Sequence, residues 1–510
     1  MVIVNIIVFI FVLGLVIIIH ELGHFIMAKR ANILCHEFSF GMGPLIWSKR
    51  VNETLYCIRA IPIGGYVMMA GEEISNEVVS VGQVVRLVFD EFNNVEKIIL
   101  DHENEKYEQY ESVTVTNIDL RGENNNPLQL NEYTVKRNAF YVFKKNKELQ
   151  IAPVERSFES KTKMQRFLAM FAGPFMNLVL AFFIFLIVNL IVGFPNMKGT
   201  VLGDISPDYP AAEALESGDE IVSVDGNPVY SWDDISVALD EDPTDRLVEF
   251  VVLRNGSEET VYVTPVIFFY SIGLHSQSES IDDLIIGEMN SETLAGKAGI
   301  LENDEILTID SITMNTWADV AQAFNNNVNG VEMSIEILRG TETITFLITP
   351  YNHDLVISQG LKVVDSFIGI GPIYEFGFFR SFSASGLDVK ASAAMIFTTL
   401  DLLFSNDQVG IGDLAGPVGI YDITSRALSA GFISFLTWTA LLSVNLAVIN
   451  LLPIPALDGG RLVFLGYEAI TTKKPNKRVE NTLHYAMYIM LMGLFVYITF
   501  NDILRLFDIR

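Results

Sequence analysis

Residues 2–30 read VIVNIIVFIFVLGLVIIIHELGHFIMAKR, an apolar run that passes directly into an HExxH sequence at His20 to His24. About 20 residues of apolar helix are enough to cross the hydrocarbon core of a bilayer. The run has no basic residues before it and no small-x-small cleavage site after it, which disfavours a cleaved signal peptide. The stretch therefore predicts a membrane-spanning helix that carries ionisable side chains, which are costly in a membrane and are normally retained for function.

The composition of the whole chain also favours a membrane protein. Of its 510 residues, 50% are hydrophobic and 19% are charged, and the mean hydropathy is +0.35. A soluble protein of this size needs more polar surface, so a purely soluble protein is disfavoured. The net charge of −28 excludes a nucleic-acid binder that uses a basic face, and two cysteines exclude a disulfide-framed secreted domain.

Three further segments are long and apolar enough to span a bilayer, at about residues 167–193, 432–452 and 485–500. Lysines and arginines cluster between the first two spans and again between the last two. Because short loops rich in these residues stay in the cytoplasm, both clusters lie on the same side, and both chain termini face outward. The stretch 200–380 then also faces outward, and it holds 32 Asp and Glu against 6 Lys and Arg.

This acidic stretch contains an internal repeat. Residues 215–265 align without a gap with residues 300–350, so that Asp219-Glu220-Ile221 matches Asp304-Glu305-Ile306. Each copy predicts a strand, a turn, an amphipathic helix and a further strand pair, a unit that resembles a PDZ domain. Because two copies are too few for a solenoid, we expect each copy to fold alone. Such domains either capture a peptide terminus or strand, or serve as spacers that bind no peptide.

The HExxH sequence carries the chemistry. On a helix, two histidines four residues apart project from one face and can ligate one Zn²⁺, and Glu21 is then placed to take a proton from a water at the metal. A catalytic zinc needs a third protein ligand, for which Asp458 in Asn450 to Gly460 (NLLPIPALDGG) is the candidate. This stretch interrupts an apolar segment with two prolines, which is tolerated only inside protein or beside a wet cavity. The alternative is a helix end whose histidines touch lipid headgroups.

These motifs together resemble one family, the intramembrane site-2 zinc metalloproteases, and within it the bacterial RseP and RasP type. Besides HExxH and NLLPIPALDGG, the resemblance rests on three further sequence motifs: Phe171-Ala172-Gly173-Pro174 with Asn177, Pro62-Ile63-Gly64-Gly65-Tyr66, and Gly416-Pro417-Val418-Gly419-Ile420.

The resemblance implies roles for seven residues. It implies that zinc is held by His20, His24 and Asp458. It further implies that Glu21 activates water and that Asn450 contacts the substrate backbone or the developing oxyanion. Gly64 and Gly65 resemble the turn of the family's membrane-re-entrant β-hairpin, which pairs with an unwound substrate. Such pairing would satisfy the amides that an unwound transmembrane helix exposes.

The predicted fold class is an α-helical multi-pass membrane protein with about four transmembrane helices, two inserted PDZ-like α+β domains and a β-rich cytoplasmic insertion. In chain order, the predicted parts are the first transmembrane helix (1–30), the re-entrant β-hairpin region (31–71), the β-rich insertion (72–160), the second transmembrane helix (161–194), the PDZ-like domains (199–270 and 283–352), a connecting region with an amphipathic helix (353–431), and the third (432–470) and fourth (480–507) transmembrane helices.

The predicted function is that of a zinc endopeptidase in the bacterial plasma (inner) membrane, with its PDZ-like domains outside the cytoplasm. By resemblance, its substrates are transmembrane segments of anti-sigma factors already shortened by an upstream site-1 protease, and remnant signal peptides. The rival hypothesis is a catalytically inert membrane scaffold that binds outer peptides through its PDZ pair. The carboxylates Glu21 and Asp458 argue against it, since a scaffold needs no buried carboxylates.

Overall fold

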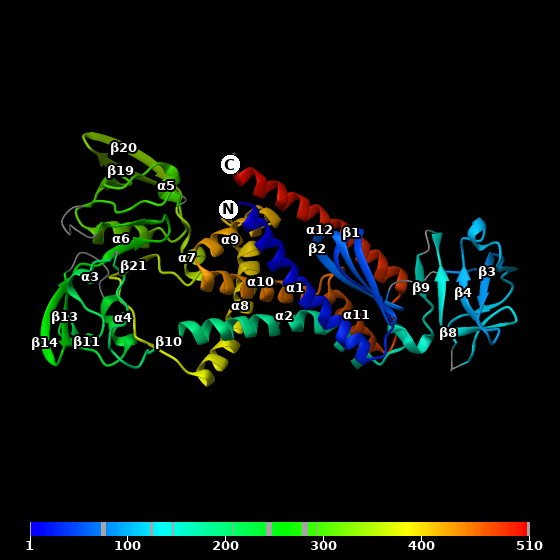
Figure 1. The fold of residues 1–510 in the computed structure, drawn as a ribbon. Helices are drawn as coiled ribbons and strands as arrows, with labels where there is room; N and C mark the ends of the chain where they lie inside the picture. Colours follow the sequence, from blue (N-terminus) through cyan, green and yellow to red (C-terminus); the bar gives the residue numbers. More distant parts are fainter. Residues whose placement is uncertain are drawn as a thin grey trace. The chain divides into compact units, whose positions relative to one another are not determined.

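The computed structural model describes residues 2–72, 78–122, 126–144, 147–207, 209–240, 247–277, 284–291 and 293–506. The predicted bounds 283 and 507 lie outside these residues. The chain divides into two compact units (Figure 1). We call residues 1–187, 385–396 and 412–510 the membrane unit, and residues 188–384 and 397–411 the repeat unit.

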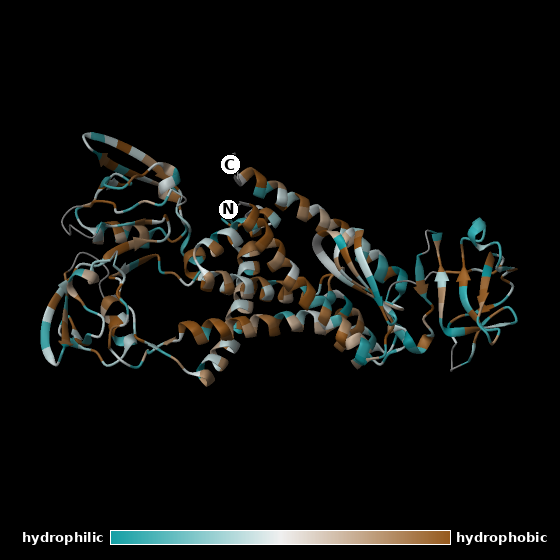
Figure 2. Ribbon diagram, viewed as in Figure 1, coloured by the Kyte–Doolittle hydropathy of each residue, from teal (hydrophilic) through white to brown (hydrophobic). Residues whose placement is uncertain are grey.

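Four helices among the described residues are long and apolar enough to cross a membrane. They are α1 (Val2–Arg30), α2 (Lys163–Val192), α10 (Phe432–Leu451) and α12 (Lys477–Leu506). These helices contain the four apolar segments expected from the sequence, and they carry much of the brown, hydrophobic ribbon in Figure 2. Their outward-facing apolar side chains are exposed in the protein itself, as is normal for a surface that lipid covers.

Small residues let these helices approach one another. On α10, Ala440 and Val444 are fully buried against Ala181 and Phe185 of α2. The Oγ of Ser443 donates a hydrogen bond of 2.8 Å to the backbone oxygen of Asn177 at the same interface. Because lipid is as apolar as the helix surfaces, close packing and such hydrogen bonds hold membrane helices together.

Helix α9 (Pro417–Ser429) explains the motif at residues 416–420. The Oδ2 of Asp502 on α12 accepts a 2.8 Å hydrogen bond from the backbone N–H of Gly419, near the start of α9. A Cβ at Gly416 would lie 2.8 Å from the same oxygen. The glycines therefore leave room for a carboxylate at a helix N-terminus, where negative charge is favoured.

Strands β1 (Cys35–Val51) and β2 (Thr54–Met69) form a ribbon of four segments. Residues 45–51 pair with residues 54–59, and residues 35–40 pair on one side with this part of β2 and on the other with residues 65–69. Among the described strands, residues 65–69 pair on one side only and form an edge of the ribbon. We call them the edge strand.

The hairpin turn predicted at Gly64 and Gly65 is wrong in its position. The chain turns between β1 and β2 at Asn52 and Glu53, where Asn52 has φ +52. Gly64 has φ +87 and lies at the bend inside β2 that leads into the edge strand. The sequence predicts the tip of the hairpin at this glycine pair, but the pair lies at a later bend, where β2 turns into the edge strand.

The predicted β-rich insertion is a seven-stranded sheet with the order β5-β3-β4-β8-β7-β6 and with β9 paired to β8. Its strands are β3 (Val84–Phe89), β4 (Val95–Ile99), β5 (Glu111–Thr114), β6 (Ile118–Asp119), β7 (Leu128–Leu130), β8 (Tyr133–Val142) and β9 (Glu148–Gln150). Alternating valines, leucines and isoleucines fill one face and form its core.

In the repeat unit, the two copies have the same strand order. Copy 1 contains β11 (Glu220–Val224), β12 (Asn227–Pro228), α4 (Trp232–Asp240), β13 (Val248–Arg254) and β14 (Ser257–Val263). Copy 2 contains β17 (Glu305–Ile309), β18 (Ile312–Thr313), α6 (Trp317–Asn326), β19 (Met333–Arg339) and β20 (Glu342–Ile348). Each copy forms a four-stranded antiparallel sheet, with the irregularity at Ile221/Ser223 of the first repeated at Ile306/Thr308 of the second.

The repeated Asp and Arg form one ion pair in each copy. Asp219 and Arg254 are 2.7 Å apart, and Asp304 and Arg339 are also 2.7 Å apart. Both carboxylates are buried, and the hydrogen bond from Arg254 lowers the pKa of Asp219. Each pair therefore joins the loop before the first strand to the third strand of its sheet.

The expectation that each copy folds alone is wrong for copy 1. The backbone of residues 368–371 accepts hydrogen bonds from Gly203, Ser206 and Ala211, and Ile368 is buried in the core of copy 1. The equivalent residues of copy 2 are 272–275, where Ile272 accepts a hydrogen bond from Ala295. Copy 2 is therefore contiguous from about residue 266 and is inserted into copy 1, which is completed by the strand that follows copy 2. The predicted boundary at residue 270 falls in the turn between the paired strands Val266–Phe269 and Leu274–His275, and so divides a hairpin of copy 2.

This nesting predicts a crossed effect of two matched substitutions. Ile368→Asp places a charge in the core of copy 1, so amide exchange in residues 199–263 should accelerate about tenfold or more, with residues 304–348 unaffected. Ile272→Asp should accelerate exchange in copy 2 instead. Hydrogen exchange of the full chain, read by mass spectrometry, measures both. Faster exchange in copy 1 for Ile272→Asp would contradict the nesting.

Candidate metal centre and active site

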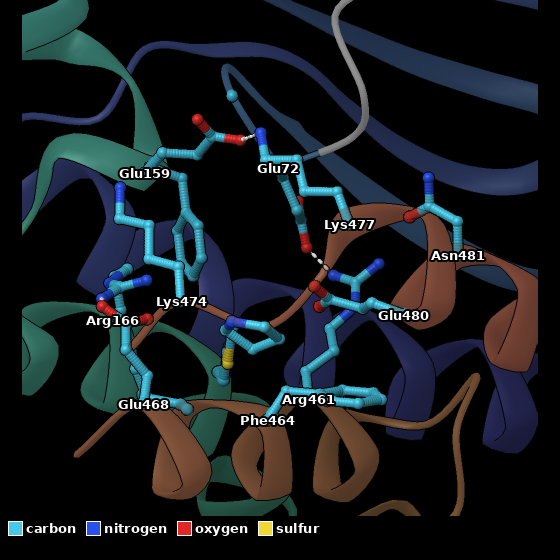
Figure 3. Close-up of a pocket in the computed structure, with 15 residues that line it drawn as sticks. Glu72, Glu159, Arg166, Arg461, Phe464, Glu468, Lys474, Lys477, Glu480 and Asn481 are labelled. Atoms are coloured by element: carbon cyan, nitrogen blue, oxygen red, sulfur yellow. Dashed lines mark hydrogen bonds and ion pairs between the residues drawn. The ribbon is translucent and has the colours of Figure 1, made fainter. Parts of the chain in front are cut away.

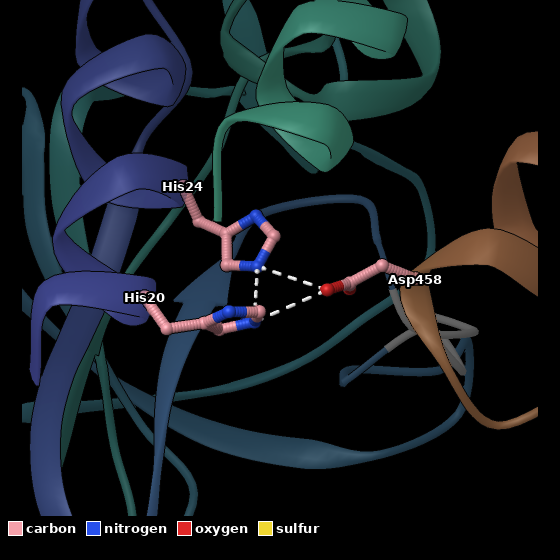
Figure 4. A group of neighbouring side chains, drawn as sticks. All are labelled: His20, His24 and Asp458. Atoms are coloured by element: carbon pink, nitrogen blue, oxygen red, sulfur yellow. Dashed lines mark hydrogen bonds and ion pairs between the residues drawn. The ribbon is translucent and has the colours of Figure 1, made fainter. Parts of the chain in front are cut away.

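Three side chains from two distant parts of the chain meet in the membrane unit. The Nε2 atoms of His20 and His24 are 3.2 Å apart, and each lies close to Oδ2 of Asp458, at 3.1 Å and 3.3 Å (Figure 4). The histidines come from α1, and the aspartate is the first residue of α11 (Asp458–Thr471). Both histidines are 7% exposed, so the cluster is closed to bulk solvent on the α1 side.

The donor atoms fit a zinc ion. Tetrahedral zinc takes imidazole nitrogen and carboxylate oxygen at about 2.0–2.2 Å, which places neighbouring ligand atoms roughly 3.4 Å apart. The three measured separations, 3.1 to 3.3 Å, are close to this value. Three protein ligands of this kind leave a fourth position open, as catalytic zinc sites require.

Helix α2 supports the histidine side of the cluster. The Nδ1 of His24 lies 2.7 Å from the backbone oxygen of Ala169, so the other ring nitrogen, Nε2, faces Asp458. A Cβ at Gly173 would lie 2.2 Å from Nε2 of His24, and a Cβ at Gly23 would lie 2.1 Å from the oxygen of Ala172. These glycines let α1 and α2 approach closely enough for the ring to fit between them.

The aspartate is positioned by a folded loop between α10 and α11. Pro453 and Pro455 end the helix, and Ala456 has φ +83. A Cβ at Gly459 would lie 2.2 Å from the oxygen of Leu452, and one at Gly460 would lie 2.4 Å from that of Ile454. The loop therefore folds back against its own backbone, which only glycine permits, and Asp458 is presented at the start of α11.

A cavity of about 950 Å³ contains this cluster. The structure brings all seven sequence-predicted site residues to its wall: His20, Glu21, His24, Gly64, Gly65, Asn450 and Asp458. The edge strand lines the cavity along its length, and a Cβ at Gly65 would lie 3.1 Å from Cγ of Glu21. The edge strand, which has one edge unpaired among the strands that the structure describes, thus passes directly beside the carboxylate and the metal-binding cluster.

Comparison with known proteins identifies the family of the chain. The model of peptidase family M50 matches residues 8–494. The chain belongs to peptidase family M50. The zinc metalloprotease RasP of Bacillus licheniformis is 36% identical over 511 residues, 99% of each chain, and the regulator of sigma-W protease RasP of Bacillus subtilis is 32% identical over 511 residues, again 99% of each. A putative zinc metalloprotease of Staphylococcus aureus is 33% identical over 513 residues, 99% of each chain.

This M50 protein is a zinc metalloprotease of the site-2 protease type.

Ion pairs fix the ribbon that carries its edge strand. Glu53, in the turn between β1 and β2, is 2.6 Å from Arg156 and 2.5 Å from Lys29. The hydrogen bond from Arg156 lowers the pKa of Glu53 to about 2, so the pair is charged at neutral pH. Tyr66 of the edge strand donates a 2.6 Å hydrogen bond to the buried Glu37.

A charged cluster beside the cavity that contains the metal-binding residues was not predicted from the sequence. Around a second pocket of about 120 Å³, Glu72 pairs with Arg461, Glu159 pairs with Lys477, and Arg166 lies 2.7 Å from Glu468 (Figure 3). Arg461 and Glu72 line both cavities. The available signal was Arg461 itself, a charge that interrupts an apolar run directly after two glycines.

His484 was also missed, because no partner stands at ligand spacing in the sequence. Its Nδ1 accepts a 2.8 Å hydrogen bond from the backbone N–H of Ala456, in the loop that presents Asp458. His484 lies on α12, so this bond holds the loop to a helix that is remote in the sequence. The interaction depends on helix packing, which residue spacing does not reveal.

The space at Gly173 can be tested by filling it. Gly173→Ala places a methyl group against the His24 ring, so the purified protein should bind zinc about tenfold more weakly or worse. Gly466→Ala on α11 is the matched control, because its Cβ would meet open space and zinc binding should not change. Zinc affinity is measured by competition with a chelator. Equal affinities for the two variants would contradict the role of Gly173.

Proposed function

We propose that this protein cleaves peptide bonds within transmembrane segments of other proteins. The observation that carries the proposal is the triangle of three metal-binding atoms, built by a helix long enough to span a membrane and by a loop that breaks another. A soluble-type protease acting outside would have its HExxH sequence outside the apolar helices. Here the sequence lies in α1 itself.

His20, His24 and Asp458 would hold the zinc ion. When bound, zinc acts as a Lewis acid that polarises the scissile carbonyl and lowers the pKa of water. Glu21 is not one of the three ligands, and it lies on the cavity wall one residue from His20, so it accepts the proton of the attacking water. Asn450 offers a side-chain amide on the same wall, where it donates a hydrogen bond to the substrate carbonyl oxygen.

The edge strand would bind the substrate backbone. A transmembrane helix satisfies its amides internally, so a protease must unwind it before a peptide bond becomes accessible. Once unwound, the segment needs new hydrogen-bond partners, and strand addition supplies them. Residues 65–69 have a free edge among the described strands and line the cavity beside Glu21, which supports this role.

The substrate class follows from the resemblance and from one relative's name. A 32% identical relative is named for regulating sigma-W, which supports anti-sigma factors as substrates of this protein. Remnant signal peptides and segments already trimmed by an upstream site-1 protease belong to the same class. We place the enzyme in the bacterial plasma membrane, with the repeat unit as a PDZ-like pair outside the cytoplasm, consistent with the positions of the lysine and arginine clusters.

Two substitutions separate the catalytic role from the ligand role. Glu21→Gln should keep zinc and lose nearly all cleavage, because the attacking water loses its proton acceptor. Asp458→Ala should lose both, because two histidines hold zinc weakly. The measurements are zinc content by mass spectrometry and cleavage of a model transmembrane segment with a short outer tail. Cleavage by Glu21→Gln at the normal rate would contradict the role of Glu21 as proton acceptor. Absence of cleavage by the unchanged, zinc-loaded protein would favour the scaffold hypothesis, in which the site is inert.

The edge strand can be tested through its bend. Gly64→Ala forces a side chain into a left-handed conformation at φ +87 beside Met42, so the edge strand shifts and turnover of the transmembrane substrate should fall about tenfold with zinc content unchanged. Gly82→Ala carries the same type of strain at φ +91 in open space, and it should leave turnover unchanged. If both variants cleave equally fast, the edge strand does not position substrate.

A further inference from the structure

Asn177 on α2 lies next to a zinc-binding histidine but does not line the cavity. Its side chain is fully buried, and Nδ2 lies 3.4 Å from Nδ1 of His20. Its Oδ1 is also buried, and it finds no hydrogen-bond partner among the described residues. A buried amide oxygen without a donor is costly, so the position calls for an explanation.

The position of the proton on the His20 ring explains why this amide is buried here. When Nε2 of a neutral imidazole faces a metal, the ring proton must be on Nδ1, which then needs an acceptor. A half turn of the Asn177 amide exchanges its nitrogen and oxygen at nearly the same positions. The turn gives Oδ1 a donor and gives the N–H of His20 an acceptor, and Nδ2 then takes the position in which Oδ1 had no partner among the described residues.

The second histidine has a corresponding partner on the same helix. Nδ1 of His24 lies 2.7 Å from the backbone oxygen of Ala169, eight residues before Asn177. Ser443 of α10 bonds to the backbone oxygen of Asn177 and fixes α2 at this level. Helix α2 therefore offers one oxygen to each imidazole, from the backbone for His24 and from a side chain for His20.

We propose that Asn177 is a positioning residue of the metal centre: its Oδ1 accepts the Nδ1–H of His20 and turns Nε2 toward the zinc position. The inference rests on the proposed role of His20 as a ligand. It explains why Asn177 follows the glycine and proline of its motif, since Gly173 makes room for one ring and Asn177, one helical turn further, orients the other.

The test compares two substitutions of nearly equal volume in the full-length protein. Asn177→Leu removes the acceptor and should weaken zinc binding about 10- to 100-fold, while Asn177→Asp keeps an acceptor and should bind zinc at least as tightly as the unchanged protein. Zinc affinity is measured by chelator competition, and the melting temperature of the metal-free protein is measured beside it. Cobalt-loaded samples give visible spectra that report the loss of an imidazole from the metal.

Two controls separate this role from packing. Ser443→Ala removes the hydrogen bond to the backbone of Asn177 and should change zinc affinity less than threefold. Asp458→Ala shows whether the ligand assignment itself holds, because it should lose zinc whatever Asn177 does. If Asn177→Leu binds zinc normally, or if Asn177→Asp is as weak as Asn177→Leu, the inference is wrong. A weakened affinity that follows the melting temperature in all Asn177 and Ser443 variants would also overturn it.

Discussion

A metal site among apolar helices requires three charged or polar side chains to meet within about 3.4 Å where water cannot compensate an error in their positions. In this protein, two of them come from the C-terminal half of α1 and the third from a residue more than 430 positions later. The helices must therefore touch at the site, and glycine occupies positions where a side chain would prevent this close approach. Gly23 and Gly173 serve the contact of α1 with α2, and Gly459 and Gly460 serve the loop before α11.

The same constraint explains why supporting groups stand outside the helix that bears the ligands. A histidine on α1 cannot be oriented by its own helix, because the helix backbone has satisfied its hydrogen bonds internally. The oxygen of Ala169 and the amide of Asn177 reach the rings from α2, while His484 reaches the aspartate loop from α12. Each ligand is thus held by a neighbour, and loosening one helix contact disturbs several bonds at once.

The sequence was informative where chemistry is local and silent where it depends on packing. HExxH and Asp458 could be identified because their residue types and apolar surroundings are visible in the chain, and the four spans follow from hydropathy. His484 and Arg461 could not be assigned, because their partners come from other helices. The nesting of the repeat copies was missed for a related reason: only the hydrogen bonds of residues 266–277 and 364–373 show which copy each segment completes. The bend at Gly64 was misread because positive φ occurs at all three changes of direction of the ribbon: at Gly41 and Gly43, at Asn52 and at Gly64.

The metal centre and the proposed substrate-binding edge are anchored by different forces, and a protease of membrane helices benefits from that separation. Zinc ligands must stay within a few tenths of an ångström, and they are held by buried, close-packed helix contacts. An edge strand must accept backbones of varied sequence, and it belongs to a ribbon fixed at its far turn by the charges of Glu53, Arg156 and Lys29. Because strand addition reads backbone amides rather than side chains, one edge can serve many substrates while the metal cluster keeps its geometry.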